Sequence, residues 1–133
     1  MSRNREERKL VLLAVIVDGE WSISPNAFRA ALKARWPTVT FTELDDTWDY
    51  AFRWANADPD VWEGQLDRNG RGLALRGTLE GAARITCWFR AMVPTELSMW
   101  FVDEGNNAHV DATPELSPEL LAAAYIAAAN REA

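Results

Sequence analysis

The order of apolar and polar positions is nearly the same in two stretches of this chain, residues 19–54 and 77–112. Each stretch runs through a helix-period apolar stripe, a proline, an alternating strand, an acidic turn and a second strand. An apolar strand precedes each stretch. The pattern therefore predicts a β-α-β-β unit that occurs twice, which indicates an architecture without indicating a chemistry.

Helix starts are marked by capping residues. Ser24 precedes Pro25, and Thr78 precedes the second stripe. A hydroxyl at the cap accepts a hydrogen bond from an otherwise unpaired backbone N–H, and proline at the first helical position loses no hydrogen bond. Ser117, followed by another proline, predicts a third helix at the C-terminal end.

Several segments have the pattern of strands. Residues 10–17 are continuously apolar, which is typical of a strand that is covered on both faces or lies centrally in a sheet. Asn69-Gly70 separates two further strands and predicts a tight hairpin, because this pair supplies the positive φ angles such turns demand. We expect an α+β domain whose mostly antiparallel sheet has six or seven strands. Its helices would lie mainly on one face, with an additional C-terminal helix.

One strand carries a row of aromatic residues, and in a regular strand they would share one face. The row consists of Trp48, Tyr50, Phe52 and Trp54. Facing the helices, it would be part of the core, since each aromatic ring contributes a large apolar area. Facing outward, it would be a partner surface or a platform for sugars or bases. Base stacking normally accompanies a cationic groove, and the charge of this chain has the opposite sign.

Composition is that of one ordinary domain, with 133 residues of which 48% are hydrophobic, and a single cysteine. We divide the chain into a flexible charged tail, residues 1–9, and a single α+β domain, residues 10–133. The apolar run at 10–17 is shorter than the roughly 20 residues that a membrane-spanning helix needs. Acidic residues follow it where a signal-peptide cleavage site would need small ones. We therefore expect cytoplasmic localisation and no membrane partner.

Charge narrows the choice of partners. Residues 1–9 hold four bases and two acids, so the other residues hold ten bases and eighteen acids, a net charge of −8. Such a surface repels phosphate backbones, which are bound through clustered lysine and arginine. We expect no nucleic-acid partner, and a basic protein partner fits better.

Acidic residues gather at the turn of each unit and could be solvated turn residues, a partner-facing patch, or groups for acid–base or cation chemistry. The chain has no EF-hand spacing, and no nucleophile motif or second metal ligand accompanies its one histidine, His109. We therefore expect no catalytic residue, no metal and no cofactor. The candidate partner-binding residues are Asp45, Asp46, Trp48, Asp49, Tyr50, Asp103 and Glu104.

The second unit resembles small acidic bacterial proteins with no assigned activity, through residues 73–81, 88–90, 93–94 and 103–105. More loosely, the chain is similar to bacterial toxin-neutralising immunity proteins, which are small, acidic, cytoplasmic α+β proteins that block a toxin through carboxylate and aromatic contacts. Residues 44–49 resemble the acidic, tryptophan-containing segment of barstar. That segment is helical in barstar, whereas the alternation predicts a strand here, so no residue role is carried over.

This resemblance implies a non-enzymatic inhibitor that neutralises a basic protein toxin through acidic and aromatic surface residues. Two alternatives stay open. One is a structural module that buries a tryptophan-rich surface in a homodimer. The other, less favoured, is a small enzyme that uses two of the carboxylates.

Overall fold

The computed structural model describes residues 11–45, 49–58, 60–105 and 108–132. Two of the candidate residues, Asp46 and Trp48, lie outside these ranges. Within them the chain forms seven strands and three helices. The strands are β1 (Val11–Ile16), β2 (Thr40–Glu43), β3 (Tyr50–Ala55), β4 (Val61–Asp67), β5 (Gly72–Gly77), β6 (Met99–Asp103) and β7 (His109–Asp111), and the helices are α2 (Pro25–Arg35), α3 (Leu79–Arg90) and α4 (Pro118–Glu132).

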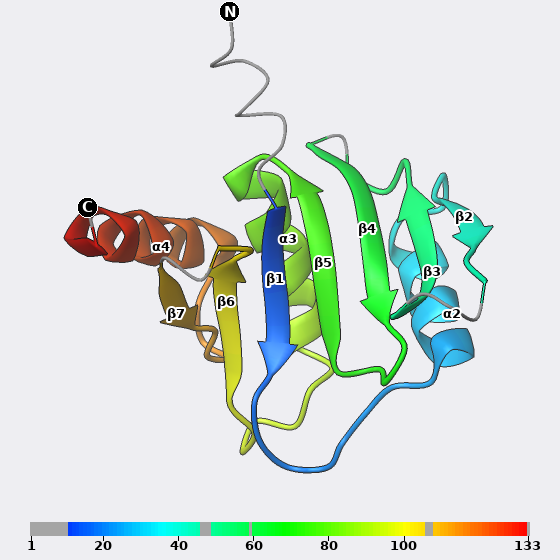
Figure 1. Ribbon diagram of the computed structural model, residues 1–133, viewed down its shortest axis with the longest axis horizontal. Helices are drawn as coiled ribbons and strands as arrows, with labels where there is room; N and C mark the ends of the chain where they lie inside the picture. Colours follow the sequence, from blue (N-terminus) through cyan, green and yellow to red (C-terminus); the bar gives the residue numbers. More distant parts are fainter. Residues whose placement is uncertain (1–10, 46–48, 59, 106–107, 133) are drawn as a thin grey trace, which may run out of the picture.

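The strands form one sheet in the order β2-β3-β4-β5-β1-β6-β7, and every neighbouring pair is antiparallel. This confirms the predicted α+β class. The apolar strands that open the two units, β1 and β5, lie side by side near the middle of the sheet (Figure 1). The hairpins that close the units, β2–β3 and β6–β7, form opposite edges.

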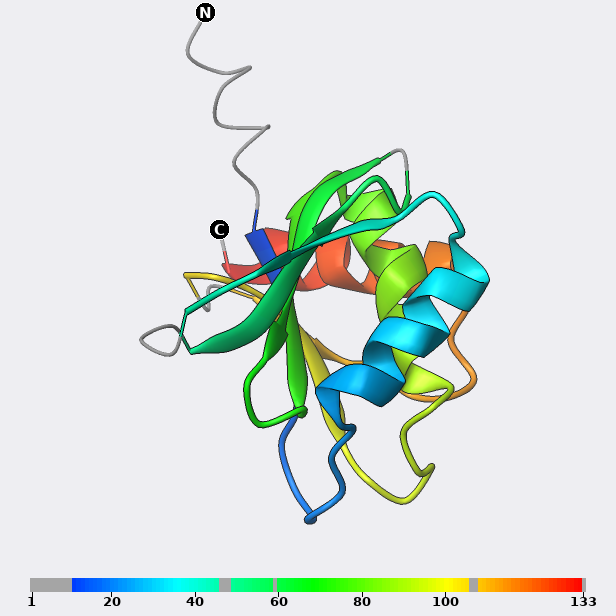
Figure 2. The ribbon, with the colours of Figure 1, turned by 90° about the vertical axis from the view of Figure 1, so that its right-hand side faces the viewer.

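The helices lie on one face of the sheet. Figure 2 shows the sheet on one side of the molecule and the helices α2 and α3 on the other. The opposite face, which is turned toward the viewer in Figure 1, is not covered by any described helix. In the described part of the chain, the helices therefore form a second layer on one side of the sheet only.

Capping residues start the helices as predicted. The hydroxyl groups of Ser24, Thr78 and Ser117 each accept a hydrogen bond from the backbone N–H three residues further on, at 3.1 Å. Each cap satisfies a donor that has no partner inside its helix.

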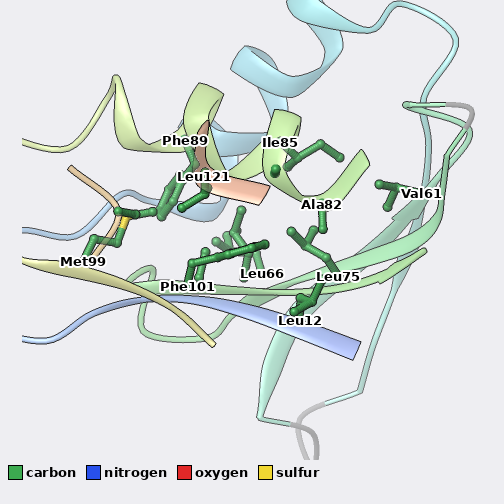
Figure 3. Close-up of a cluster of buried hydrophobic side chains, with 14 of the residues drawn as sticks. Leu12, Val61, Leu66, Leu75, Ala82, Ile85, Phe89, Met99, Phe101 and Leu121 are labelled. Atoms are coloured by element: carbon green, nitrogen blue, oxygen red, sulfur yellow. The ribbon is translucent and has the colours of Figure 1, made fainter. Parts of the chain in front are cut away.

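The core lies between the sheet and the helices, with side chains from α3 meeting those of the strands (Figure 3). Phe28 of α2 lies at the centre of the aromatic part of this core. Its ring centroid lies 5.3 Å from that of Trp54, 5.6 Å from that of Trp88 and 5.9 Å from that of Phe89. Phe52 and Trp54 are each only 1% exposed, so these two members of the aromatic row belong to the core.

The expectation that the aromatic row shares one face is wrong for Tyr50. A β-bulge lies between Tyr50 and Phe52, so that Tyr50 pairs with Asp67 while Phe52 pairs with Leu66. Adjacent residues of β4 point to opposite faces of the sheet, and their partners do the same. The extra residue in the bulge therefore turns Tyr50 onto the uncovered face, away from the core.

The hairpin between β4 and β5 is confirmed, but its turn differs from the predicted one. Gly70 has a φ of +72°, but Asn69 does not have the positive φ that was predicted for it. In the described part of the chain, Asn56 is the only non-glycine residue with positive φ. The N–H of Gly70 donates to the carbonyl oxygen of Asp67 at 2.8 Å. The connection is therefore an ordinary turn closed by one left-handed glycine, in a longer loop than a two-residue hairpin has.

Candidate functional site

A cavity of about 210 Å³ lies on the uncovered face of the sheet. Residues from β1, β3, β4 and β5, together with one residue directly after β6, surround it. They are Val11, Leu13, Tyr50, Glu63, Gln65, Ala74, Arg76 and Glu104. Three of these side chains are aliphatic and the others carry polar or charged groups, so the cavity has both an apolar and a polar part.

Strand register brings these residues together. Gln65 pairs with Ala74, which pairs with Leu13, and these three residues form one row across β4, β5 and β1. Glu63, Arg76 and Val11 form the next row in the same way. Residues that are directly opposite on neighbouring strands point to the same face. The cavity is therefore built from two adjacent cross-strand rows.

Glu104 extends the row of Glu63, Arg76 and Val11 at its β1 end. Its backbone N–H donates to the carbonyl oxygen of Val11 at 3.0 Å, which fixes its place beside the end of β1. Within the described residues no ion pair engages its carboxylate, which is exposed. The Nε of Arg76 lies 3.7 Å from Oε2 of Glu63, and the Arg76 side chain is half exposed. Such a long, solvated pair contributes little to stability.

Negatively charged side chains lie near the phenol of Tyr50. Burial raises the pKa of its phenol, the carboxylates of Asp67, Asp49 and Glu104 raise that pKa further, and Arg76 acts in the opposite direction. The phenol is therefore neutral at physiological pH, where its O–H can donate a hydrogen bond and its ring can contact a cation.

The cavity unites some of the predicted residues. Tyr50 and Glu104 both line it, and Asp49 is close enough to raise the pKa of the Tyr50 phenol. Asp45 lies at the same end of β3, because the Nη2 atom of Arg68 donates both to the carbonyl oxygen of Asp45 at 3.1 Å and to that of Tyr50 at 3.2 Å.

Asp103 lies on the other face of the sheet from this cavity, and its part in partner binding stays a prediction. Its carboxylate accepts a hydrogen bond of 2.7 Å from the hydroxyl of Tyr125, a buried residue of α4. Asp103 pairs with Leu12 in the sheet, and both side chains point toward the helices. The alternation along β6 therefore separates Asp103 from the next acidic residue, which lines the cavity on the other face.

Sequence reasoning missed the acidic and amide side chains of β4. The polar residues of β4 occupy every second position, namely Glu63, Gln65 and Asp67, and they point away from the face on which Leu66 is buried. The sequence could therefore have predicted that these three side chains share one face of the sheet. Their location beside Tyr50 was not predictable, because it depends on the bulge in β3 and on pairing with strands distant in sequence.

A second hollow, of about 370 Å³, lies at the β3–β4 connection, lined by Thr38, Asn56, Ala57, Asp58, Val61 and Trp62. The Trp62 side chain is 45% exposed there. Both carboxylate oxygens of Asp58 are already used: Arg84 donates to each of them at 2.8 Å, and the N–H of Asp60 donates to one at 2.9 Å. Both carboxylate oxygens of Asp58 are therefore already occupied by donors of the protein, and neither is left for a ligand in this hollow.

Asp58 should make folding sensitive to acid. The hydrogen bonds from Arg84 hold the pKa of the Asp58 carboxyl below its ordinary value, which is about 3.9 in an unfolded chain. Folding then favours the ionised form, so the stabilisation is present above the unfolded pKa and is lost as the pH falls through the folded pKa. We expect Asp58→Asn to lower the free energy of unfolding by about 1–3 kcal/mol at pH 7.

Urea denaturation at several pH values measures this effect, and the difference between wild type and variant should shrink as the pH falls below the unfolded-state pKa. Asp111→Asn, at an exposed position of the edge strand β7, is the matched control and should behave like wild type. A difference that stayed constant between neutral and acidic pH would contradict a contribution from the Asp58 charge.

The described residues contain no group of three or more histidine, cysteine or acidic side chains arranged to hold a metal ion. No helix among them combines the length and the apolar character required to cross a bilayer. Comparisons with known protein families, with curated proteins and with solved structures found no match.

Proposed function

We propose that this chain is a non-enzymatic protein-binding module that receives a basic protein on the uncovered face of its sheet. The observation that carries the proposal is the cavity on the side of the molecule where no described helix lies, which Tyr50 lines together with the acidic residues Glu63 and Glu104. Tyrosine is enriched among the residues that dominate binding energy, and the surrounding carboxylates suit a cationic surface.

Net charge supports the same conclusion. The residues after position 9 carry a net charge of −8, so a basic partner would be attracted over a longer distance than contact alone allows. Among basic partners we favour a protein toxin, which this chain would neutralise in the cytoplasm as an immunity-type inhibitor. Such a role needs charge complementarity and no reacting groups. The homodimer alternative has less support, because Phe52 and Trp54 are buried in the core.

The strongest test uses the protein encoded by the adjacent reading frame as the candidate partner. We expect association to slow at least tenfold when the salt concentration rises from about 0.05 M to about 0.5 M, because salt screens attraction between surface charges. Surface plasmon resonance or stopped-flow fluorescence gives the association rate constant directly.

Two double variants with equal net charge separate the site from the overall charge. Asp49→Lys with Glu104→Lys should slow association strongly. Glu20→Lys with Glu115→Lys changes exposed acids of the β1–α2 and β7–α4 connections and should slow it much less. An association rate that ignored salt, or that fell equally in both variants, would count against the uncovered face as the binding surface.

A further inference from the structure

The size of the cavity on the uncovered face suits one side chain. Its volume of about 210 Å³ is below the roughly 300–1,000 Å³ typical of small-molecule sites. It is also several times the roughly 30 Å³ that one water occupies in the liquid. A ligand that fills it would therefore be about as large as a single long side chain of a partner protein.

The chemistry of the walls suits a ligand with an apolar stem and a cationic head. Val11, Leu13 and Ala74 offer aliphatic surface. Glu104, Gln65 and Tyr50 line the cavity with them, and their side chains carry a carboxylate, an amide and an aromatic ring. Arginine and lysine both place a charged head on an aliphatic stem. The planar guanidinium of arginine additionally stacks on aromatic rings and directs several N–H donors at once toward carboxylate and amide oxygens.

Among the described residues, Arg76 is the cation that lines the cavity, and it pairs with one of the two glutamates there. Arg76 is directed toward Glu63, and the 3.7 Å separation of these two groups places them at the limit of an ion pair. Glu104 supplies a further carboxylate, which no ion pair within the described residues engages. The carboxylates of Glu63 and Glu104 therefore outnumber the resident guanidinium by one.

We propose that this cavity receives an arginine side chain of the basic partner, with Glu104 and Gln65 accepting its N–H donors and Tyr50 against its plane. The inference rests on the proposed function, because it assigns the partner chemistry recognised at the same surface. It makes Arg76 a competitor of the incoming guanidinium.

N-acetyl-L-arginine amide is the probe, and titration of the full-length protein followed by two-dimensional NMR is the measurement. We expect a dissociation constant of about 1 mM, since a ligand of this size has few atoms in contact. The largest shifts should occur at the backbone amides of Val11 and Ala74 and at the side-chain amide of Gln65. N-acetyl-L-citrulline amide, which has the same shape without the charge, should produce none at these positions.

Two substitutions should change the affinity in opposite directions. Glu104→Gln should weaken binding about fivefold, because it removes the charge-assisted hydrogen bonds. Arg76→Gln should strengthen binding, because it removes the competing cation and frees Glu63. Glu20→Gln, in the β1–α2 connection, should leave the affinity unchanged. All three positions are exposed or half exposed, and the dispersion of the amide spectrum verifies that each variant is folded.

Equal shifts with the arginine and citrulline probes, or weaker binding in Arg76→Gln, would overturn the assignment. The tail offers a competing source of arginine, and this is tested in the full chain by replacing Arg3, Arg5, Arg8 and Lys9 with glutamine. Tighter probe binding in that variant would overturn the assignment to a partner. Salt-dependent partner binding without probe binding would refute only the arginine subsite, whereas probe binding without a basic partner would refute only the proposed function.

Discussion

Replacing Gly64 with alanine is expected to destabilise the fold by about 3 kcal/mol or more. Gly64 of β4 lies directly opposite Trp54 of β3, and a Cβ atom added to Gly64 would stand well inside 3.0 Å of the Trp54 indole carbons. The indole cannot move aside at low cost, because Trp54 is 1% exposed and packs on Phe28. Relief therefore requires a shift of the strand or of the aromatic core.

A double-mutant cycle tests this explanation by urea denaturation. Trp54→Phe removes the outer part of the indole and its Nε1 atom, which is buried without a hydrogen-bond partner among the described residues. Alone it should cost about 1–3 kcal/mol for the cavity that it leaves. Combined with Gly64→Ala it should cost clearly less than the sum, because the added methyl group then occupies vacated space.

The matched control is Gly72→Ala in the neighbouring strand β5. There the nearest atom to an added Cβ is the carbonyl oxygen of Ala14 at 3.1 Å, which requires a much smaller adjustment. We expect Gly72→Ala to have the smaller effect. Additive costs in the cycle, or a Gly64→Ala protein as stable as wild type, would show that the Trp54 contact does not explain the glycine.

Local features of the fold were predictable because they depend on neighbouring residues. The caps at Ser24 and Thr78 follow from hydrogen bonds that span three positions. The central place of β1 follows from an uninterrupted apolar run. Seven antiparallel strands and helices on one face are what such elements form when each buries a single apolar face.

The candidate site was predictable only in part, because long-range register decides it. Tyr50 and Glu104 were chosen for their residue types, and they meet in one cavity although they are distant in sequence. A bulge that nothing in the residue types announces turns Tyr50 away from Phe52. Asp103, one position before Glu104, points to the helices and bonds Tyr125. A one-residue change of register would exchange these two acidic residues.

Arg90 illustrates the same limit in the core. It is the last residue of α3, where a basic side chain is ordinarily solvated and interacts favourably with the helix dipole. Here the side chain is 4% exposed. Its Nε donates to the carbonyl oxygen of Ala112 at 2.8 Å, and its two terminal nitrogens donate to four more carbonyl oxygens at 2.9–3.3 Å. Those four belong to Val93, Pro94, Thr95 and Leu97.

Arg90→Met is expected to lower the free energy of unfolding by about 3–5 kcal/mol, a large part of the stability of a domain this size. The methionine keeps much of the apolar stem but removes the guanidinium from five carbonyl oxygens, of which that of Pro94 still accepts from the N–H of Leu97. Arg90→Lys should recover little of the loss, since one ammonium group cannot reach carbonyl oxygens on both sides of the connection. Urea denaturation provides the global measurement.

Hydrogen exchange adds a local measurement that a simple loss of packing would not reproduce. The N–H of Val93 donates to the carbonyl oxygen at the end of α3, the N–H of Leu97 donates within the α3–β6 connection, and that of Ala112 donates to Met99 at the start of β6. In both Arg90 variants these amides should exchange faster relative to those of β1 and β5, because the guanidinium joins the two segments. Lys33→Met removes one charge from an exposed position of α2 and should alter neither measurement by more than about 0.5 kcal/mol. Unchanged protection at 93–97 and 112 would mean that these segments hold their conformation without Arg90.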